Sequence, residues 1–398
     1  MIEDLERLVT GRADSLFARD LARHEADLRA AIEGRRIAVL GAAGSIGSAL
    51  TRRLVAAAPK HLSLIDLSEN NLVELVRDLR SSPEIRMPEG FETLAIGLGS
   101  HELARYFEDA APFDRVFNLC AIKHVRAERD PYGIARMVDT NMLFLDDWLS
   151  GLPAPLRHLF SVSTDKATEP VSLMGASKLG MELVLRRHAE RHPFSTARFA
   201  NVAFSDGSLL HGFLKRIEKR QPIAAPRGIR RYFMSHRESG ELCLLAGALG
   251  RNGDVFVPRL EAESNARTLP EIAILTLEHA GFEALECATE DEARRRMPEA
   301  LARKRWPCYF ADAATSGEKP IEIFHSEADT LDTDRFEAVA IVRSSAGAGQ
   351  ADRLDDFLSF ARRARERRTS KEEYVAAFRT LLGRFDHVET GRDLDQQM

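Results

Sequence analysis

The stretch Arg36-Ile-Ala-Val-Leu-Gly41-Ala-Ala-Gly44-Ser-Ile-Gly47 decides the fold of this chain. A short apolar run that ends at a glycine is typical of a strand buried on both faces of a parallel sheet. The glycines allow a tight turn, a close approach of backbone amides to a pyrophosphate, and close packing of the next helix, expected over Ser48–Ala58. Because glycine-rich turns often serve packing alone, this motif by itself indicates a dinucleotide site only weakly.

A second signal, the acidic residue Asp66, stands at the end of the next predicted strand, nineteen residues beyond Gly47. A carboxylate there can accept hydrogen bonds from both hydroxyls of an adenosine ribose and would repel a 2′-phosphate. The alternative is an ordinary N-cap for the helix expected over Ser68–Arg80. The position and spacing favour the cofactor role, and NAD over NADP. The predicted cofactor contacts in this half are Gly41, Gly44, Ser45, Ile46, Gly47, Asp66 and Leu67.

Further strand-like runs recur along the chain, each followed by a helical stretch. They lie at 61–65, 93–96, 115–119, 158–162 and 195–199. The alternation predicts right-handed βαβ crossovers, and hence an α/β fold with a doubly wound parallel sheet of the Rossmann type over residues 34–200.

The flanking regions follow other patterns. Residues 1–33 have helical leucine spacing and no chemical motif, so we expect an N-terminal helical arm of one or two helices for packing or subunit contact. Proline- and arginine-rich segments at 221–227 and 230–235 are expected to be loops of a smaller, mixed α/β substrate-binding lobe. That lobe and a C-terminal extension are assigned to 201–398, from which single segments could return to the Rossmann sheet. Residues 344–349 are expected to be a mobile loop.

Composition excludes several classes of function. The net charge of −5 provides no global positive field to hold nucleic acid or an anionic membrane. The N-terminus lacks a signal-peptide pattern, and no apolar run reaches the ~18 residues of a membrane span, so we expect neither export nor a membrane anchor. The four cysteines (Cys120, Cys243, Cys287 and Cys308) stand far apart without ligand spacing, which favours a cytoplasmic protein without metal or disulfides.

The stretch Ser161–Lys178 follows a buried strand, so Ser163 to Lys166 are predicted to lie at the carboxyl end of the sheet. Ligands bind at that edge in open α/β folds. Asp165 and Lys166 stand side by side there as candidate catalytic groups. A solvated Asp-Lys pair in a turn is the alternative, but it leaves the rest of the stretch unexplained.

With these motifs, the chain resembles the NAD(P)-dependent UDP-N-acetylglucosamine 4,6-dehydratases of bacterial polysaccharide and protein glycosylation, which belong to the extended short-chain dehydrogenase/reductase superfamily. The resembling pieces run in the family's order and cover roughly residues 35–325. They are Gly41–Gly47, Asn118–Val125, Ser163–Lys166, Met174–Lys178, Arg198–Val202, Ser205–Ser208, Arg231–Ser235, Gly253–Val257 and Ser316–Lys319.

One position sets this chain apart within the superfamily. A tyrosine four residues before the lysine normally takes the proton of the sugar hydroxyl that is oxidised, and here that position is Met174. A thioether cannot exchange a proton. A branch of the dehydratase family is similar in carrying methionine there, whereas a 4-epimerase would be expected to need the tyrosine.

The resemblance implies a redox-neutral dehydration at carbons 4 to 6 of a nucleotide-linked sugar, in which a hydride leaves carbon 4 and returns to carbon 6 on bound NAD. It implies that Asp165 is the general acid for the carbon 6 hydroxyl and that Lys166 is the base at carbon 5. Lys178 is implied to hold the nicotinamide ribose, and Thr164 or Ser163 to orient the sugar. For the carbon 4 hydroxyl proton, Asp165 and a bound water both remain open as acceptors.

Further contacts are carried over from the matching positions. Ala121, Lys123, Asn141 and Lys178 are the remaining expected cofactor contacts. Lys123, Lys166, Asn201, Ser208 and Arg231 are expected to touch the sugar or the diphosphate, for which arginine is well suited. His124 is interpreted as structural, and no chemistry is assigned beyond residue 325. Helices over about 141–150 and 178–191 are expected to pair subunits in a homodimer or a larger closed assembly.

Two rival functions remain at this stage. A nucleotide-sugar 4-epimerase would release an isomer of its substrate, whereas a dehydratase would release a product lighter by one water. A non-catalytic NAD-binding regulator would need none of the three residues Asp165, Lys166 and Lys178. The nucleotide, the sugar and the stereochemistry at carbon 5 stay undetermined by the sequence.

Overall fold

A computed structural model describes residues 2–123, 125–312, 319–343 and 350–388 of the chain. Its centre is a nine-stranded sheet in the order β14-β15-β10-β6-β5-β4-β1-β2-β3. The strands from β3 to β10 are parallel, and β15 and β14 add to them antiparallel at one edge. This is the predicted doubly wound α/β sheet.

The sheet strands are β1 (Arg36–Leu40), β2 (His61–Ile65), β3 (Gly90–Leu94), β4 (Arg115–Asn118), β5 (Leu159–Thr164), β6 (Phe194–Phe199), β10 (Asp254–Pro258), β14 (Thr330–Asp332) and β15 (Val339–Arg343). The first two match the expected bounds, but β3 lies three residues earlier than predicted at its start. β10, β14 and β15 come from the region beyond 201, so this region supplies both a separate lobe and one side of the main sheet. Their pairing joins strands far apart in the chain, for which no local pattern exists.

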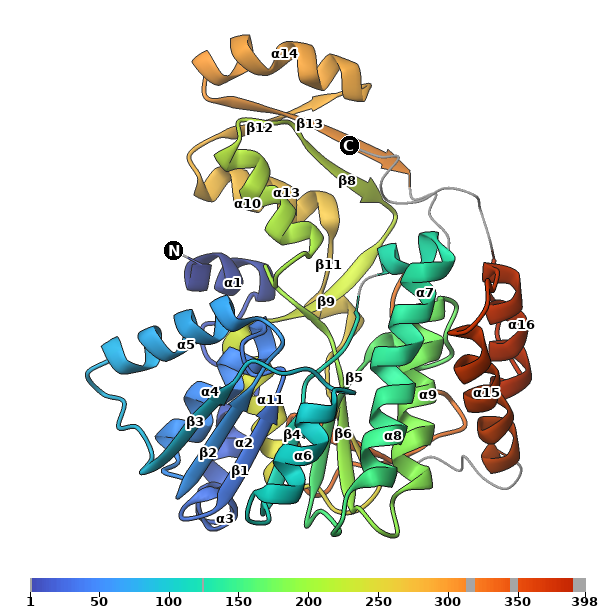
Figure 1. Cartoon of the computed structure of the whole chain (residues 1–398). Coiled ribbons are helices and arrows are strands. Elements are labelled where there is room, and N and C mark those ends of the chain that lie inside the picture. The colour runs from blue at the N-terminus through green and yellow to red at the C-terminus, as the bar shows by residue number, and fades with distance from the viewer. Residues whose placement is uncertain (1, 124, 313–318, 344–349, 389–398) are drawn as a thin grey trace.

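Helices cover both faces of the sheet (Figure 1). One face carries α3 (Glu25–Ile32), α4 (Ser45–Ala56), α5 (Glu69–Ser81) and α11 (His236–Leu249). The other carries α6 (His101–Asp109), α7 (Pro131–Val138), η2 (Asp139–Leu143, a π-helical turn), α8 (Phe144–Gly151) and α9 (Leu173–Arg187). Both α4 and α5 begin close to the positions that the sequence predicts.

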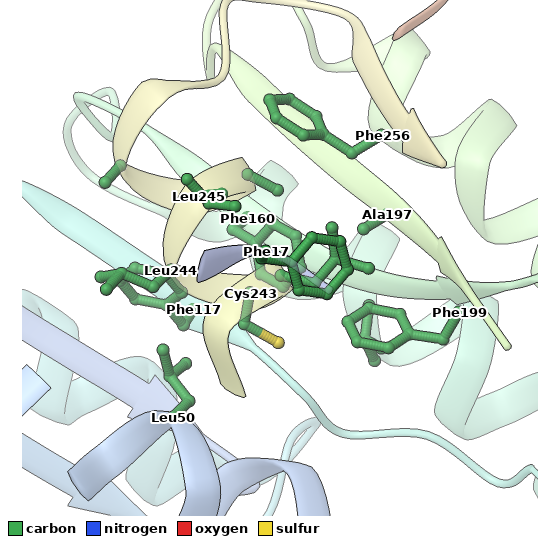
Figure 2. Close-up of a cluster of buried hydrophobic side chains, with 14 of the residues drawn as sticks. Phe17, Leu50, Phe117, Phe160, Ala197, Phe199, Cys243, Leu244, Leu245 and Phe256 are labelled. Atoms are coloured by element: carbon green, nitrogen blue, oxygen red, sulfur yellow. The ribbon is translucent and has the colours of Figure 1, made fainter. Parts of the chain in front are cut away.

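Aromatic side chains from neighbouring strands form the core on the α11 face. Figure 2 shows Phe117, Phe160 and Phe256 in one cluster with Leu244 and Leu245 of α11 and with Phe17 from the N-terminal arm. All six are at most 7% exposed. This packed layer holds the strands in place. The strands in turn position the residues that follow their carboxyl ends.

A smaller lobe lies beyond the carboxyl ends of the strands (Figure 1). Its sheets have the orders β12-β13-β8 and β11-β9-β7. The strands are β7 (Asn201–Val202), β8 (Ile223–Arg227), β9 (Arg230–Met234), β11 (Ala266–Thr268), β12 (Glu283–Cys287) and β13 (Arg305–Asp312). The helices are α10 (Leu209–Glu218), α12 (Ala262–Asn265), α13 (Leu269–His279) and α14 (Glu290–Ala302).

The prediction of loops at 221–227 and 230–235 was wrong, because these segments form β8 and β9. Pro226 discouraged the assignment of a strand, but β8 is an edge strand, where a missing N–H is tolerated. β9 pairs with β11 and β7, which are distant in the sequence.

The arm predicted at 1–33 consists of three helices rather than one or two: α1 (Ile2–Thr10), α2 (Ala18–Arg23) and α3. Its role within the chain is packing. Arg12 forms a two-pronged ion pair with Glu238 of α11 at 2.8 and 2.7 Å, and Asp20 accepts the backbone N–H groups of residues 337 and 338.

The C-terminal part adds the helices α15 (Gln350–Ala364) and α16 (Lys371–Leu382), which pack against α7, η2 and α9 (Figure 1). The loop expected at 344–349 lies outside the described residues. Within the described ranges, no helix combines the length and apolar character that crossing a membrane requires.

Candidate active site

The glycine-rich turn between β1 and α4 has the geometry of a ligand cradle. Gly41 adopts a positive φ of 76°, and a Cβ there would lie 2.9 Å from the carbonyl carbon of Leu119. A Cβ on Gly47 would lie 2.1 Å from the Gly41 carbonyl oxygen, so helix and turn pack too closely for any other residue. Gly44 is the N-cap of α4 and offers no side-chain cap, which leaves the first helical amides available to an anionic ligand.

Asp66 lies next to this cradle. Its carboxylate accepts the N–H of Ala43 in the turn at 2.9 Å and the N–H of Ser68 at 2.9 Å. The same residue therefore connects the turn to the end of β2 and retains oxygen lone pairs for a ribose. Leu67, the next predicted contact, is 73% exposed beside it. Ile46 is partly buried in the first turn of α4.

The other side of the cradle is formed by the segment after β4. The Lys123 ammonium donates to Ser205 Oγ at 3.3 Å. Ser45 accepts the N–H of Asp206 at 3.0 Å, so the glycine turn and the segment 205–206 are joined. Ala121, two residues before Lys123, is partly buried.

The side chain of Asn141 is hydrogen-bonded to this segment. Its side chain accepts the Ile122 N–H at 2.9 Å and donates to the Ile122 carbonyl at 3.0 Å and to Ser177 Oγ at 2.9 Å. Because these bonds use both donors and the acceptor, Asn141 positions residues 121–123. It contributes to a cofactor site by holding this segment rather than through a free polar group.

The Asp165–Lys166 pair lies in a short turn, η3 (Asp165–Ala167), directly after β5, as predicted. Asp165 is buried, and its Oδ1 accepts from Thr164 Oγ1 at 2.9 Å and from Lys166 Nζ at 3.0 Å. Lys166 Nζ also donates to Asn201 Oδ1 at 3.4 Å. Four predicted residues, Thr164, Asp165, Lys166 and Asn201, thus converge at the carboxyl end of the sheet.

A second carboxylate faces Lys166 from the segment after β13. Glu322 is 3% exposed, and its Oε1 lies 4.0 Å from Lys166 Nζ and 4.0 Å from Arg231 Nη2. The pKa of Glu322 lies above its ordinary value, mainly through burial and against the opposing charge of Lys166. Lys319 lies three residues before it and donates to the Thr168 carbonyl at 2.7 Å. Arg231 Nη1 donates to the Lys319 carbonyl at 2.8 Å.

A buried ion pair supports this arrangement from beneath. Arg198 Nη2 lies 2.9 Å from Glu182 Oε2, and its Nη1 donates to Thr168 Oγ1 at 3.1 Å and to the Phe324 carbonyl at 3.0 Å. Ser163 donates to Glu182 at 2.6 Å. The hydroxyl proton of Ser163 is thus committed to this network, and the expectation that Thr164 or Ser163 orients the sugar stays a prediction.

Lys178 and Met174 lie on α9. Lys178 Nζ donates to the Val162 carbonyl at 2.6 Å, and burial lowers the pKa of the Lys178 ammonium to about 7. Met174 is 2% exposed, and its backbone N–H donates to Glu128 Oε1 at 2.8 Å. The position of the superfamily tyrosine is thus occupied by an apolar side chain within the core.

Not every predicted residue joins the cluster. Ser208 is the N-cap of α10, where its hydroxyl accepts the His211 N–H at 3.2 Å. His124 and residues 316–318 lie outside the described residues. Glu322 was missed by the sequence analysis. A faint signal existed, because it follows the Ser316–Lys319 motif by three positions, but it is one acidic residue among 61.

Comparison with known proteins places the chain in a family. The model of the polysaccharide biosynthesis protein family matches residues 37–288, and the chain belongs to this family. It is 30% identical to the capsular polysaccharide biosynthesis protein CapD of Staphylococcus aureus over 57% of its length, although the match spans only 38% of CapD. It is also 30% identical to the UDP-glucose 4-epimerase of Rickettsia typhi, over 60% of this chain and 71% of that protein.

Two solved structures share the fold. Pen from Bacillus thuringiensis has a TM-score of 0.64 at 19% identity, covering 80% of this chain and 90% of its own. A double mutant of DesIV, a dTDP-glucose 4,6-dehydratase from Streptomyces venezuelae with NAD bound, has a TM-score of 0.54 at 17% identity, covering 84% and 98%. These likenesses show a shared fold, the Rossmann-like parallel sheet with helices on both faces.

Proposed function

We propose that this chain is a nucleotide-sugar 4,6-dehydratase of polysaccharide biosynthesis, with a UDP-N-acetylhexosamine, first of all UDP-N-acetylglucosamine, as its substrate. The observation that carries the proposal is the pairing of Lys166 with the buried Asp165 at the carboxyl end of β5, in a chain with methionine at position 174. A 4-epimerase of this superfamily would be expected to need a tyrosine there.

The cradle suits NAD as the resident cofactor. The tight turn at Gly41 and the uncapped start of α4 fit a pyrophosphate, and Asp66 fits the adenosine ribose. When bound, NAD supplies a hydride acceptor for carbon 4 that is also the hydride donor for carbon 6. Lys178 fits a role beside the nicotinamide ribose, since it lies buried on α9 behind β5.

The acid–base groups have distinct tasks in this proposal. Asp165 Oδ1 is occupied by Thr164 and Lys166, so its free Oδ2 would donate a proton to the departing carbon 6 hydroxyl. Lys166 Nζ would take the proton from carbon 5 and return it. Arg231 and Lys319 supply positive charge beside these groups, which suits the diphosphate of the substrate.

The alternative with specific support is a 4-epimerase, because a 30% identical relative carries that name. The test is incubation of the purified protein with a panel of UDP- and dTDP-sugars, followed by mass spectrometry and proton NMR. A product lighter by one water supports dehydration, and NMR then gives the configuration at carbon 5. A product of unchanged mass with inverted carbon 4 would establish the epimerase. Absence of turnover with every sugar would favour a regulator.

A further inference from the structure

Lys166 lies between two buried carboxylates rather than beside one. Asp165 Oδ1 lies 3.0 Å from Lys166 Nζ, and Glu322 Oε1 lies 4.0 Å from it. Each carboxylate has one remaining oxygen, Asp165 Oδ2 and Glu322 Oε2, that is buried and has no hydrogen-bond partner among the described residues. A buried polar atom without a partner is costly, which indicates that a ligand group satisfies it in the working protein.

The dehydration proposed above needs more than two acid–base groups. It takes one proton from the carbon 4 hydroxyl and one from carbon 5, and it gives one to the departing hydroxyl and one back to carbon 5. Asp165 has to be protonated to act as the acid, and Lys166 has to be neutral to act at carbon 5. Neither is therefore free to accept the first proton, and the thioether of Met174 has no capacity to do so.

Of the titratable groups around Lys166 in the described parts of the chain, one remains. A guanidinium such as that of Arg231 has no lone pair to accept a proton, and Lys319 is engaged with the Thr168 carbonyl. Glu322 is a carboxylate within reach of Lys166, and it is held in place because Arg198 binds the carbonyl of Phe324 two residues further on.

We propose that Glu322 is a third acid–base residue of this site, which accepts the carbon 4 hydroxyl proton and later restores the proton of Asp165. This proposal rests on the proposed function. The O–H bond at carbon 4 breaks, an O–H bond forms on Glu322 Oε2, and the freed electron pair forms the ketone as the hydride leaves carbon 4.

The remaining steps balance the protons. Asp165 protonates the carbon 6 oxygen, which departs as water, while Lys166 takes the carbon 5 proton and gives it back when the hydride returns to carbon 6. The proton on Glu322 then passes through Lys166 Nζ to Asp165. All three groups end in their starting states.

The first test needs no substrate. Infrared difference spectra of the native protein and Glu322→Gln, recorded across pH, report the carboxyl stretch of Glu322 alone. An ordinary glutamic acid titrates at ~4.3. Because Glu322 is buried and lies near the carboxylate of Asp165, its pKa should lie above that value, although Lys166, Arg231 and Lys319 oppose the shift. A band that titrates in the ordinary range or below it would overturn the proposal whatever the protein's substrate is.

The second test follows the first chemical step with UDP-N-acetylglucosamine as the probe. In rapid mixing, Glu322→Gln should slow the absorbance change of the bound nicotinamide by about 10²–10⁴-fold with little change in KM. Glu322→Asp should recover part of the rate. Lys166→Ala should leave this first change fast and block deuterium uptake at carbon 5. Glu327→Gln, an exposed carboxylate in the same segment, is the matched control.

The two tests separate the possible failures. A native rate of the first step in Glu322→Gln, with its pH profile unchanged, would overturn the role of Glu322 while leaving the dehydratase intact. If the native protein dehydrates none of the nucleotide sugars, the proposed function fails, and the infrared titration alone decides whether Glu322 holds a proton in the site. Thermal unfolding of each variant checks that it is folded.

Discussion

At the scale of single residues, Asp66 has two roles that substitution can separate. Its oxygens accept the N–H groups of Ala43 and Ser68, and its charge is proposed to discriminate between NAD and NADP. Asp66→Asn keeps an acceptor for one of these bonds but removes the charge. We expect it to weaken NAD binding about tenfold, as for the loss of a charge-assisted hydrogen bond, and to narrow the gap between NAD and NADP.

Calorimetric titration of both cofactors into cofactor-free protein measures this effect. Glu69→Gln, at the exposed start of α5, removes an equal charge nearby. This variant should leave the ratio of the affinities for NAD and NADP unchanged. Equal affinity of the native protein for NAD and NADP would contradict the assignment of Asp66.

Met174 gives the second prediction at this scale. If the site were an epimerase that had merely lost its base, Met174→Tyr would restore activity. Because Met174 is buried in the core, the larger ring adds strain of about 1–3 kcal/mol without supplying a needed group. We expect dehydration that is unchanged or lower in Met174→Tyr, and near-native in Met174→Leu. Higher turnover of the tyrosine variant would favour the epimerase.

The same residues show how far sequence reasoning reached. The glycine turn, Asp66, Asp165 and Lys166 follow strands whose buried, apolar pattern is local, so their places at the sheet edge could be predicted. Glu322 could not, because its position depends on contacts of Arg198 with Phe324 and of Arg231 with Lys319. These contacts join segments separated by 126 and 88 positions, and no local pattern encodes them.

At the scale of elements, the ion pair of Glu182 and Arg198 connects α9 to β6 beneath the site. Burial alone would favour the neutral acid, but Arg198 and the hydroxyl of Ser163 lower the pKa of Glu182. Glu182→Gln leaves a buried guanidinium without its counter-charge, which costs about 3–5 kcal/mol. We expect a corresponding loss in the free energy of unfolding by denaturant titration.

The double variant Glu182→Leu with Arg198→Leu is the informative partner. Removal of both charges should recover much of the stability. Activity should stay low, because Arg198 also holds Thr168 and the Phe324 carbonyl. Full activity in the double variant would show that this pair does not position the site.

The junction of β5 and β6 carries a dependence on pH. His158 Nε2 lies 2.9 Å from Ser195 Oγ, which itself donates to the Ala246 carbonyl, so the ring donates to Ser195 as the neutral form. Burial, aided by Arg115, lowers the pKa of His158 from 6.5 to about 4. The His158 ring binds a proton less readily in the folded chain than in the unfolded chain. The contribution of neutral His158 to the free energy of unfolding is therefore present above pH 6.5 and is lost as the pH falls to about 4.

Thermal unfolding across this range measures the effect. His158→Gln keeps a donor for Ser195 and cannot titrate, so its stability should fall less steeply between pH 6.5 and 4 than that of the native chain. Parallel curves for the two proteins would mean that His158 does not carry this dependence.

At the scale of the whole molecule, the C-terminal helices α15 and α16 cover the helices that were expected to pair subunits. Residues 141–150 fall in η2 and α8, and the range 178–191 begins in α9. Leu354, Leu358 and Phe378 of α15 and α16 are buried in the same apolar cluster as these helices. Arg362 of α15 pairs with Asp146 at 2.9 Å, and Asp355 pairs with Arg187.

This arrangement makes the oligomeric state depend on the C-terminal helices. If α15 and α16 take the place of a second subunit, the full chain should not associate through α8 and α9, and a chain that ends at Arg343 should expose their apolar face. An exposed apolar face of this kind drives association. We therefore expect the shortened chain to sediment as a dimer or a larger species and to bind a hydrophobic dye more strongly. A shortened chain with unchanged sedimentation and dye binding would show that α15 and α16 do not shield a pairing surface.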